Sequence, residues 1–367
     1  MDFRIPFKRA LIFISTIFIL TGCLNRPQVE PGDDKITIND ALGRCVEIDP
    51  QVKRIVAVGP GALRLCCYFG EIDMVVGIEQ IDKGDSTGKP YMLANPSLKQ
   101  LPVVGQGGPN NFPDPEKIIA VAPDIIFSTY ATDTHSADRL EAKTGIPVIA
   151  ISYGETPVFD PQIYNSIEVI GKAINRDKRA KKIIDYMKDC EMELRTRTQN
   201  IASEERPSAY IGALSMRGAH GIDSTYGNYA LFNAINAKNV ADEIGRAGSI
   251  MIDKEKIIQW DPDVIFIDAG GMGIVRADYN KNPGYYNILS AFKNGKLYLQ
   301  LPFNYYHTNI DTAIANAYYM GKVLFPGSFE DIEPDEKADE IYSFLLGKEL
   351  YHQMEEDFGG FGKVTFD

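Results

Sequence analysis

The feature that most constrains the fold is an internal repeat that occurs twice at a constant offset. Residues 115–127 read PEKIIAVAPDIIF, and residues 254–266 read KEKIIQWDPDVIF. Each copy predicts a short helix, a stop at Pro-Asp and a buried apolar strand. The repeat therefore predicts an α/β fold with two lobes, each a mostly parallel sheet with βα alternation and helices on both faces.

Two predicted helices connect these lobes. Residues 161–173 form the first, and a longer one runs from Asp177 to about residue 201. The longer helix has one apolar face at helical spacing, made by Ala180, Ile183, Ile184, Met187 and Leu194. Its length of about 37 Å suits a rigid strut between the lobes, with a ligand cleft between them. An ordinary surface helix of one lobe is the alternative.

The N-terminus predicts export and a lipid anchor. Three basic residues precede an apolar run at residues 10–20, which is about half of the roughly 20 residues that a membrane span needs. The following Leu20-Thr21-Gly22-Cys23 resembles a lipoprotein cleavage site. We expect a lipid on Cys23 to hold the protein at the extracytoplasmic face of the membrane. A plain secretory signal with a coincidental cysteine is the alternative.

Length and pattern divide the rest of the chain. The polar residues before position 35 suit a tether with a reach of roughly 35 Å. The predicted segments are a signal peptide (1–22), a tether (23–34), an N-terminal lobe (35–160), a helical connector (161–205), a C-terminal lobe (206–330) and a C-terminal helix with a tail (331–367). Within them we expect a hairpin at 35–48 and a charged helical segment at 335–358.

Charge and cysteine content exclude some functions. A formal net charge of −12 argues against nucleic acid as a partner. Cys45, Cys66, Cys67 and Cys190 have neither CxxC spacing nor nearby histidines, so no zinc site is predicted. We expect free thiols, although a disulfide such as Cys45–Cys190 stays open. The glycine-rich loops fit no nucleotide motif, and no catalytic triad pattern occurs, so the chain is not predicted to be an enzyme.

Several motifs in order resemble the substrate-binding proteins of ABC importers, in the group with a helical backbone that serves iron–siderophore, haem and cobalamin uptake. The similarity covers about residues 36–347 and includes KRIVAVGPGALRL, both repeat copies and KLYLQLPFNYYH. GPGALRL and NYYHTNIDTAIANAYYMGK look closest to a branch with molybdate-type and iron-complex binders. Family members commonly carry Thr-Glu after the first strand, where this chain has Leu63-Arg64.

The resemblance implies partners and docking residues. It implies a monomeric receptor that delivers a solute to a permease dimer with a cytoplasmic ATPase. Glu116 and Glu255 match the family glutamates that dock onto arginines of the permease, one from each lobe. Alternatively, both are simply acids favoured by the dipole at a helix start.

Ligand contacts are expected in the loops that follow the strands. Imidazoles ligate metals, phenolates bind ferric iron or stack on a chelate, and cationic groups bind carboxylates or oxyanions. The candidates are Arg64, Lys89, Tyr130, His135, Arg217, His220, Tyr226, Tyr305, Tyr306, His307 and Asn309, with His307, His220 and His135 as metal ligands. The loop at residues 303–309 is the densest group, although a lone loop histidine is often structural.

The favoured ligand is a metal complex, in particular an iron chelate, with no covalent cofactor. An oxyanion such as molybdate or tungstate is the alternative. Less favoured hypotheses are a metal-handling enzyme or chelatase on a similar scaffold, which the export signal opposes, and a surface adhesion or signalling protein with the same fold.

Overall fold

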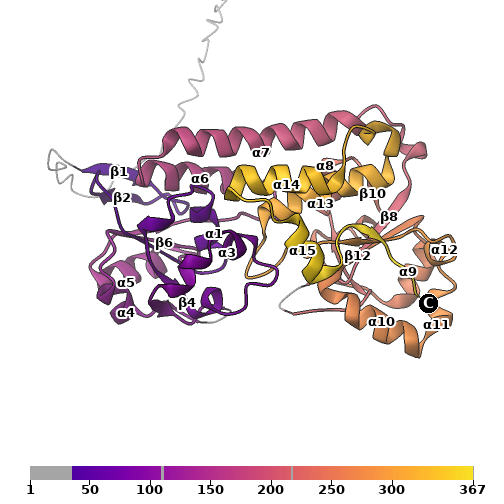
Figure 1. Cartoon of the computed structure of the whole chain (residues 1–367), viewed down its shortest axis with the longest axis horizontal. Helices are drawn as coiled ribbons and strands as arrows, with labels where there is room; N and C mark the ends of the chain where they lie inside the picture. Colours follow the sequence, from indigo (N-terminus) through magenta and orange to yellow (C-terminus); the bar gives the residue numbers. More distant parts are fainter. Residues whose placement is uncertain (1–34, 109–110, 216–217, 367) are drawn as a thin grey trace, which may run out of the picture. The chain divides into compact units, whose positions relative to one another are not determined.

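Two sheets, each containing one copy of the repeat, organise the chain (Figure 1). The computed structural model describes residues 35–108, 111–215 and 218–366. The predicted signal peptide, tether and anchor cysteine Cys23 lie outside these residues. None of the helices in the described ranges is both long and apolar enough to cross a bilayer.

The N-terminal sheet has five parallel strands in the order β5-β4-β3-β6-β7. Its strands are β3 (Ile55–Val58), β4 (Val75–Glu79), β5 (Val103–Gly105), β6 (Ile125–Ser128) and β7 (Val148–Ala150). β3 and β6 are buried along their whole length, which explains why both segments are continuous apolar runs.

The C-terminal sheet repeats this plan with one antiparallel edge strand, in the order β10-β8-β12-β13-β14. Its strands are β8 (Ser208–Gly212), β10 (Lys238–Asn239), β12 (Val264–Asp268), β13 (Leu297–Gln300) and β14 (Gly362–Lys363). The prediction of two mostly parallel βα-alternating lobes is confirmed.

The two repeat copies have the same structure. Helix α4 (Pro115–Ala120) leads to β6, and α9 (Lys254–Trp260) leads to β12. The aspartate after each repeat proline also has the same task. Asp124 accepts from the Arg54 amide at 2.9 Å, and Asp263 accepts from the Ser208 amide at 2.8 Å. Each carboxylate thus ties its strand to the start of the neighbouring one.

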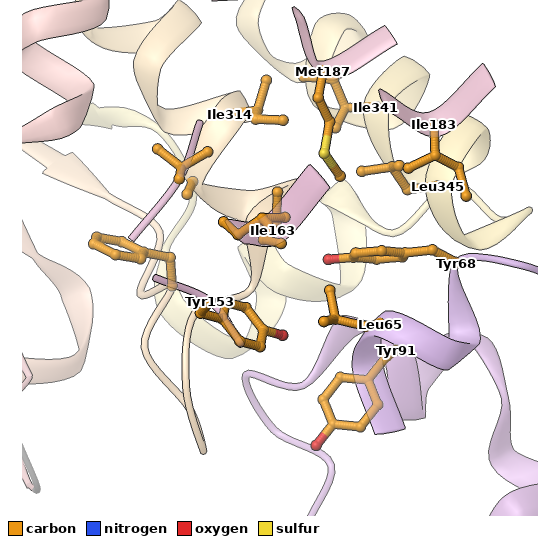
Figure 2. Packing of buried hydrophobic residues seen from close by; sticks show 14 of the residues in the cluster. Leu65, Tyr68, Tyr91, Tyr153, Ile163, Ile183, Met187, Ile314, Ile341 and Leu345 are labelled. Atoms are coloured by element: carbon orange, nitrogen blue, oxygen red, sulfur yellow. The ribbon is translucent and has the colours of Figure 1, made fainter. Parts of the chain in front are cut away.

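The connector helices are α6 (Pro161–Ala173) and α7 (Asp177–Thr198). Helix α7 contacts α6, α8 (Ala230–Ala234) and α13 (Ile310–Leu324). In Figure 1, α6 lies beneath one half of its length and the C-terminal helices lie beneath the other half. It therefore joins both halves, as a strut should. One continuous core includes side chains from both sheets and from α7. Figure 2 shows part of it, with Leu65, Tyr68, Tyr91, Tyr153, Ile163, Ile183, Met187, Ile314, Ile341 and Leu345.

The C-terminal segment differs from the expectation of one helical stretch over residues 335–358. It forms α14 (Pro334–Leu346) and α15 (Tyr351–Phe358). Gly347 ends α14 with a φ of 74°, a left-handed conformation in which glycine has no steric penalty. A single helix was expected because apolar residues recur at helical spacing on both sides of Gly347.

The remaining elements complete the structure. The expected hairpin consists of β1 (Ile36–Asn39) and β2 (Cys45–Ile48), and a second antiparallel pair consists of β9 (Ser224–Gly227) and β11 (Gly248–Met251). The other α-helices are α1 (Ala62–Cys67), α2 (Gln80–Lys83), α3 (Pro90–Ala94), α5 (Thr134–Thr144), α10 (Met272–Lys281), α11 (Pro283–Tyr286) and α12 (Ser290–Lys293). Short 3₁₀ helices cover Ile72–Met74, Pro96–Gln100, Ser203–Glu205, Val240–Ile244, Ala269–Gly271 and Pro326–Phe329.

The cysteines partly follow the expectation. Cys66, Cys67 and Cys190 are buried free thiols, so the Cys45–Cys190 disulfide is excluded. Burial raises the pKa of Cys66 to about 12, which makes it a poor nucleophile. The expectation of free thiols is confirmed for these three residues, and Cys45 is not among them.

Candidate functional site

The loop between β13 and α13 carries the densest group of predicted ligand residues. Tyr306 and His307 both have left-handed backbones, with φ values of 51° and 80°. Such conformations are uncommon for bulky residues and are costly unless the surroundings hold them. A bridge between Asn304 and Thr308, and a 2.7 Å hydrogen bond from the Asn309 amide to the Phe303 carbonyl, close the loop. The loop is therefore closed by its own backbone contacts, and its Tyr306 side chain reaches Glu79 of the N-terminal sheet.

Arg64 of α1 anchors this loop from the other side. Its side chain is fully buried. The guanidinium donates to the Tyr305 carbonyl at 2.7 Å and to the Tyr153 hydroxyl at 3.3 Å, with a longer 3.5 Å contact to the Tyr306 carbonyl. It also lies 4.6 Å from the centre of the Tyr91 ring. These partners in the described structure are all uncharged, and Arg64 Nε has no hydrogen-bond partner there.

Arg64 keeps its charge in this apolar setting. Burial alone would lower the pKa of Arg64, but Tyr153 and Tyr91 outweigh it, and the pKa lies above its ordinary value. The hydrogen-bond partners of Arg64 are neutral, and its charge also acts on the buried carboxyl groups of Asp82 and Asp311, whose pKa values it lowers against the larger effect of burial. A cation with only neutral hydrogen-bond partners still favours an anion beside it.

Glu79, at the end of β4, is hydrogen-bonded to Tyr306 of this loop. Its Oε2 accepts from the Gly59 amide at 2.9 Å and from the Tyr306 hydroxyl at 2.8 Å, while Oε1 has no partner among the described residues. The Tyr306 hydroxyl also lies 2.9 Å from that of Tyr130, which donates to the Gly108 carbonyl at 3.1 Å. Burial raises the pKa of Glu79 to about 7 against the opposing effect of these hydrogen bonds. The carboxyl group is therefore close to half-protonated near neutral pH.

His307 is held as a neutral imidazole. Its ring lies 4.0 Å from that of Tyr153, centre to centre, and its Nδ1 accepts from the Thr308 amide at 2.9 Å. Burial, and then the charge of Arg64, lower the pKa of His307 to about 4. With Nδ1 used as an acceptor, the proton of the neutral ring is on Nε2. His307 thus offers a hydrogen-bond donor rather than a lone pair at Nε2.

Two further predicted residues, Asn309 and Lys89, secure the loop and its surroundings. Asn309 donates its side-chain amide to the Gly88 carbonyl at 2.7 Å. Gly88 has a φ of 71° and lies directly against the Tyr305 ring. Lys89 donates to the Ile81 carbonyl, and burial lowers the pKa of its ammonium group. Asn309 and Lys89 therefore act here as structural contacts.

Replacing Gly88 with alanine should lower the free energy of unfolding by about 2–4 kcal/mol. An added Cβ would lie 2.5 Å from Tyr305 Cε2, in a backbone conformation that already disfavours a side chain. Gly145→Ala is the matched control, because Gly145 has a φ of 69° and no atom within 4 Å of an added Cβ. It should cost only about 1 kcal/mol. Urea denaturation measures both, and equal losses would contradict the contact with Tyr305.

Arg64, Glu79 and the loop at residues 303–309 meet at what we call the junction. The structure does not bring the other candidate residues to it. His135 is exposed on α5. His220 lines a separate pocket with Asp223 and Lys254. Tyr226 lies on β9, with its ring 5.8 Å from that of Tyr229. Arg217 lies outside the described residues. Within residues 35–108, 111–215 and 218–366, no three His, Cys, Asp or Glu side chains gather as metal ligands would.

Sequence reasoning missed Glu79 and Tyr153, which both contact the predicted residues. Glu79 is a single carboxylate directly after the apolar strand residues, and such a residue at the carboxyl end of a parallel strand is a usable signal. Tyr153 follows β7 within a loop of ordinary composition. No local pattern marks it, because its role comes only from packing against Arg64 and His307.

The two predicted docking glutamates have matching positions. Glu116 lies in the first turn of α4 and Glu255 in the first turn of α9, and both are exposed. Acids at a helix start are favoured by the dipole in any case, so their position agrees with both hypotheses.

Comparisons with known proteins address the fold and the family. The uncharacterized ABC transporter substrate-binding lipoprotein YvrC of Bacillus subtilis (strain 168) is 24% identical over 301 residues, which cover 79% of this chain and 89% of that protein. A periplasmic solute binding protein of Veillonella parvula DSM 2008 has a similar structure, with a TM-score of 0.70 at 18% identity. That likeness covers 89% of this chain and 97% of the other.

The molybdate periplasmic binding protein MolA of Haemophilus influenzae, bound to molybdate, is also similar, with a TM-score of 0.67 at 20% identity and coverage of 86% of this chain and 98% of MolA. These structural likenesses show a shared fold. The family model for periplasmic binding proteins matches residues 55–302, which is more than half of the chain. The chain therefore belongs to the periplasmic binding protein family.

Proposed function

We propose that this protein is the lipid-anchored solute receptor of an ABC importer and that it captures an anionic metal complex, in particular an iron chelate. The observation that carries the proposal is the buried, charged Arg64, whose hydrogen-bond partners among the described residues are neutral carbonyls and a hydroxyl. It lies where loops from both sheets meet, which is where ligands bind in folds of this type.

The hydrogen-bond donors at the junction suit a metal complex that is recognised through the groups of its chelator and not through the metal ion. Arg64 supplies positive potential, and neutral His307 supplies an Nε2–H donor. Both interact favourably with carboxylate or oxyanion groups. A bare metal ion would need several clustered ligands, which the described residues lack. In a chelate the metal ion is already coordinated, so the protein has to supply only complementary charge and hydrogen bonds.

An oxyanion such as molybdate is the second candidate. The same donors suit it, and MolA, a protein of similar fold, binds molybdate. The Tyr306 hydroxyl is hydrogen-bonded to Glu79 and Tyr130. Either kind of ligand would therefore have to replace some of these hydrogen bonds on entering.

Delivery completes the proposed function. Cys23 would carry the lipid, and the tether would keep the receptor near its permease, which raises the effective concentration of the pair. Glu116 and Glu255 would dock onto basic residues of a permease dimer that works with a cytoplasmic ATPase. Exposed ion pairs of this kind are worth at most about 1 kcal/mol each, so they set orientation more than affinity.

Isothermal titration calorimetry with ferric citrate, a ferric catecholate chelate and sodium molybdate tests the ligand class. We expect one ferric chelate per protein to bind. His307→Ala should weaken this binding about tenfold through loss of one hydrogen bond in a desolvated site, and exposed His352→Ala should leave it unchanged. Binding of molybdate alone would contradict the iron-chelate proposal, and binding of none of the three would contradict both ligand classes.

A further inference from the structure

Two large apolar side chains are exposed beside the two docking glutamates. Phe112 is 72% exposed and lies four residues before Glu116. Met251 is 52% exposed and lies four residues before Glu255. Single exposed apolar residues are common on protein surfaces. Two that occupy corresponding positions next to predicted docking residues require an explanation.

The correspondence follows the internal repeat. Phe112 and Met251 are separated by the same number of residues as Glu116 and Glu255. Each also lies two residues before the aspartate at the start of its helix, Asp114 for α4 and Asp253 for α9. The two halves of the chain therefore present an apolar side chain and an acid at the same sequence spacing from their repeat helices, although Met251 ends strand β11 and Phe112 lies outside any helix or strand.

Each position has a second exposed apolar neighbour. On the N-terminal side, Ile119 of α4 is 47% exposed. On the C-terminal side, Ile274 of α10 is 43% exposed and shares the wall of a pocket with Met251 and Lys254. Exposed apolar side chains therefore occur near both glutamates, and those on the C-terminal side line a pocket. Apolar anchors with charged neighbours are the usual composition of a binding hot spot.

We infer that Phe112 and Met251 are the apolar anchors with which this receptor binds its permease dimer. This inference rests on the proposed importer function and adds the residues that supply affinity. A two-fold dimer presents the same surface twice, so it fits a chain whose internal repeat presents one acid-plus-apolar pair on each half. The expected partner surface has, on each subunit, an apolar pocket beside a basic residue. The glutamates orient the encounter, and the anchors slow dissociation.

Site-specific photo-crosslinking in native membranes tests the inference. A photoreactive amino acid replaces Phe112, Met251 or Met192 in the full-length lipoprotein. Met192, on α7 and 62% exposed, is the matched apolar control. We expect positions 112 and 251 to capture the same polytopic permease subunit and position 192 to capture none. A Cys23→Ala chain, which should leave the membrane fraction, serves as the control for the anchor. Capture of a second copy of this chain at 112 and 251 would overturn the inference.

Binding of the variants to the purified permease–ATPase complex separates this inference from the proposed function. Phe112→Ala and Met251→Ala should each weaken binding about tenfold, a typical effect of removing an interface anchor, and Met192→Ala should have no effect. Their melting temperatures should match the parent, because the side chains are exposed. If Glu116→Gln and Glu255→Gln weaken binding while Phe112→Ala and Met251→Ala do not, the anchors are wrong and the docking proposal stands. If no variant or parent chain binds a permease, the importer function itself fails.

Discussion

Replacing Arg64 with methionine is expected to lower the free energy of unfolding by about 3 kcal/mol and to weaken ferric-chelate binding at least tenfold. Hydrogen bonds to a charged donor contribute about 1.5–3 kcal/mol each, and removing the donor leaves the buried Tyr305 carbonyl unpaired. Methionine fills similar volume, so a cavity is not the main effect. The gain from no longer burying a charge offsets part of the loss.

Urea denaturation and calorimetry measure the two effects of this change. Arg139→Met is the matched control, because Arg139 is exposed on α5 and should change stability by less than about 0.5 kcal/mol. Arg64→Lys keeps the charge but loses the planar set of donors, so it should recover only part of the binding. A methionine variant that retains full stability and full chelate binding would refute the role assigned to Arg64.

Replacing Glu79 with glutamine is expected to stabilise the protein at pH 8 by about 2 kcal/mol and to flatten its pH dependence. In the fold, burial raises the pKa of Glu79 from its ordinary value of 4.5 to about 7. Between these values the folded protein binds more protons than the unfolded chain. The contribution of Glu79 is therefore complete below about pH 4.5, declines as pH rises through 7, and is lost above it. A shift of this size corresponds to about 3 kcal/mol.

Glutamine stays neutral throughout this range and can still accept from the Gly59 amide and the Tyr306 hydroxyl. A residual slope should persist, because burial also raises the pKa of Asp268 to about 7. Unfolding free energies at several pH values between 5 and 8 give the comparison, with exposed Glu116→Gln as the control. If the parent and Glu79→Gln have the same slope over this range, the buried carboxyl does not titrate as argued.

The sequence predicted the parts of the site that depend on local signals. Arg64 follows a strand and a glycine turn, and the loop around Tyr306 and His307 combines aromatic and polar residues after another strand. Strand ends and loop composition can be recognised from the order of residues along the chain, so these positions could be identified as candidates. The bounds of α6 and the presence of the two repeat helices also followed from apolar spacing and proline positions.

The partners and chemical states of these residues could not be predicted in this way. Glu79 is 227 positions from Tyr306, yet the two are hydrogen-bonded. His307 looked like a metal ligand, but burial beside Arg64 and the hydrogen bond to its Nδ1 make it a donor. Such properties depend on desolvation and on contacts between distant segments, which residue spacing does not contain.

By itself, the sequence determined the two-lobed architecture, because the repeat specifies helix, stop and strand twice, and apolar periodicity dictates which faces are buried. It also determined which segments lie at strand ends. Only the tertiary structure decided that Arg64 binds the loop backbone, that Tyr306 reaches Glu79, and that His135, His220 and Tyr226 lie elsewhere. The physical reason is that local propensity acts over a few residues, whereas a binding site is made by packing of elements that are far apart in the chain.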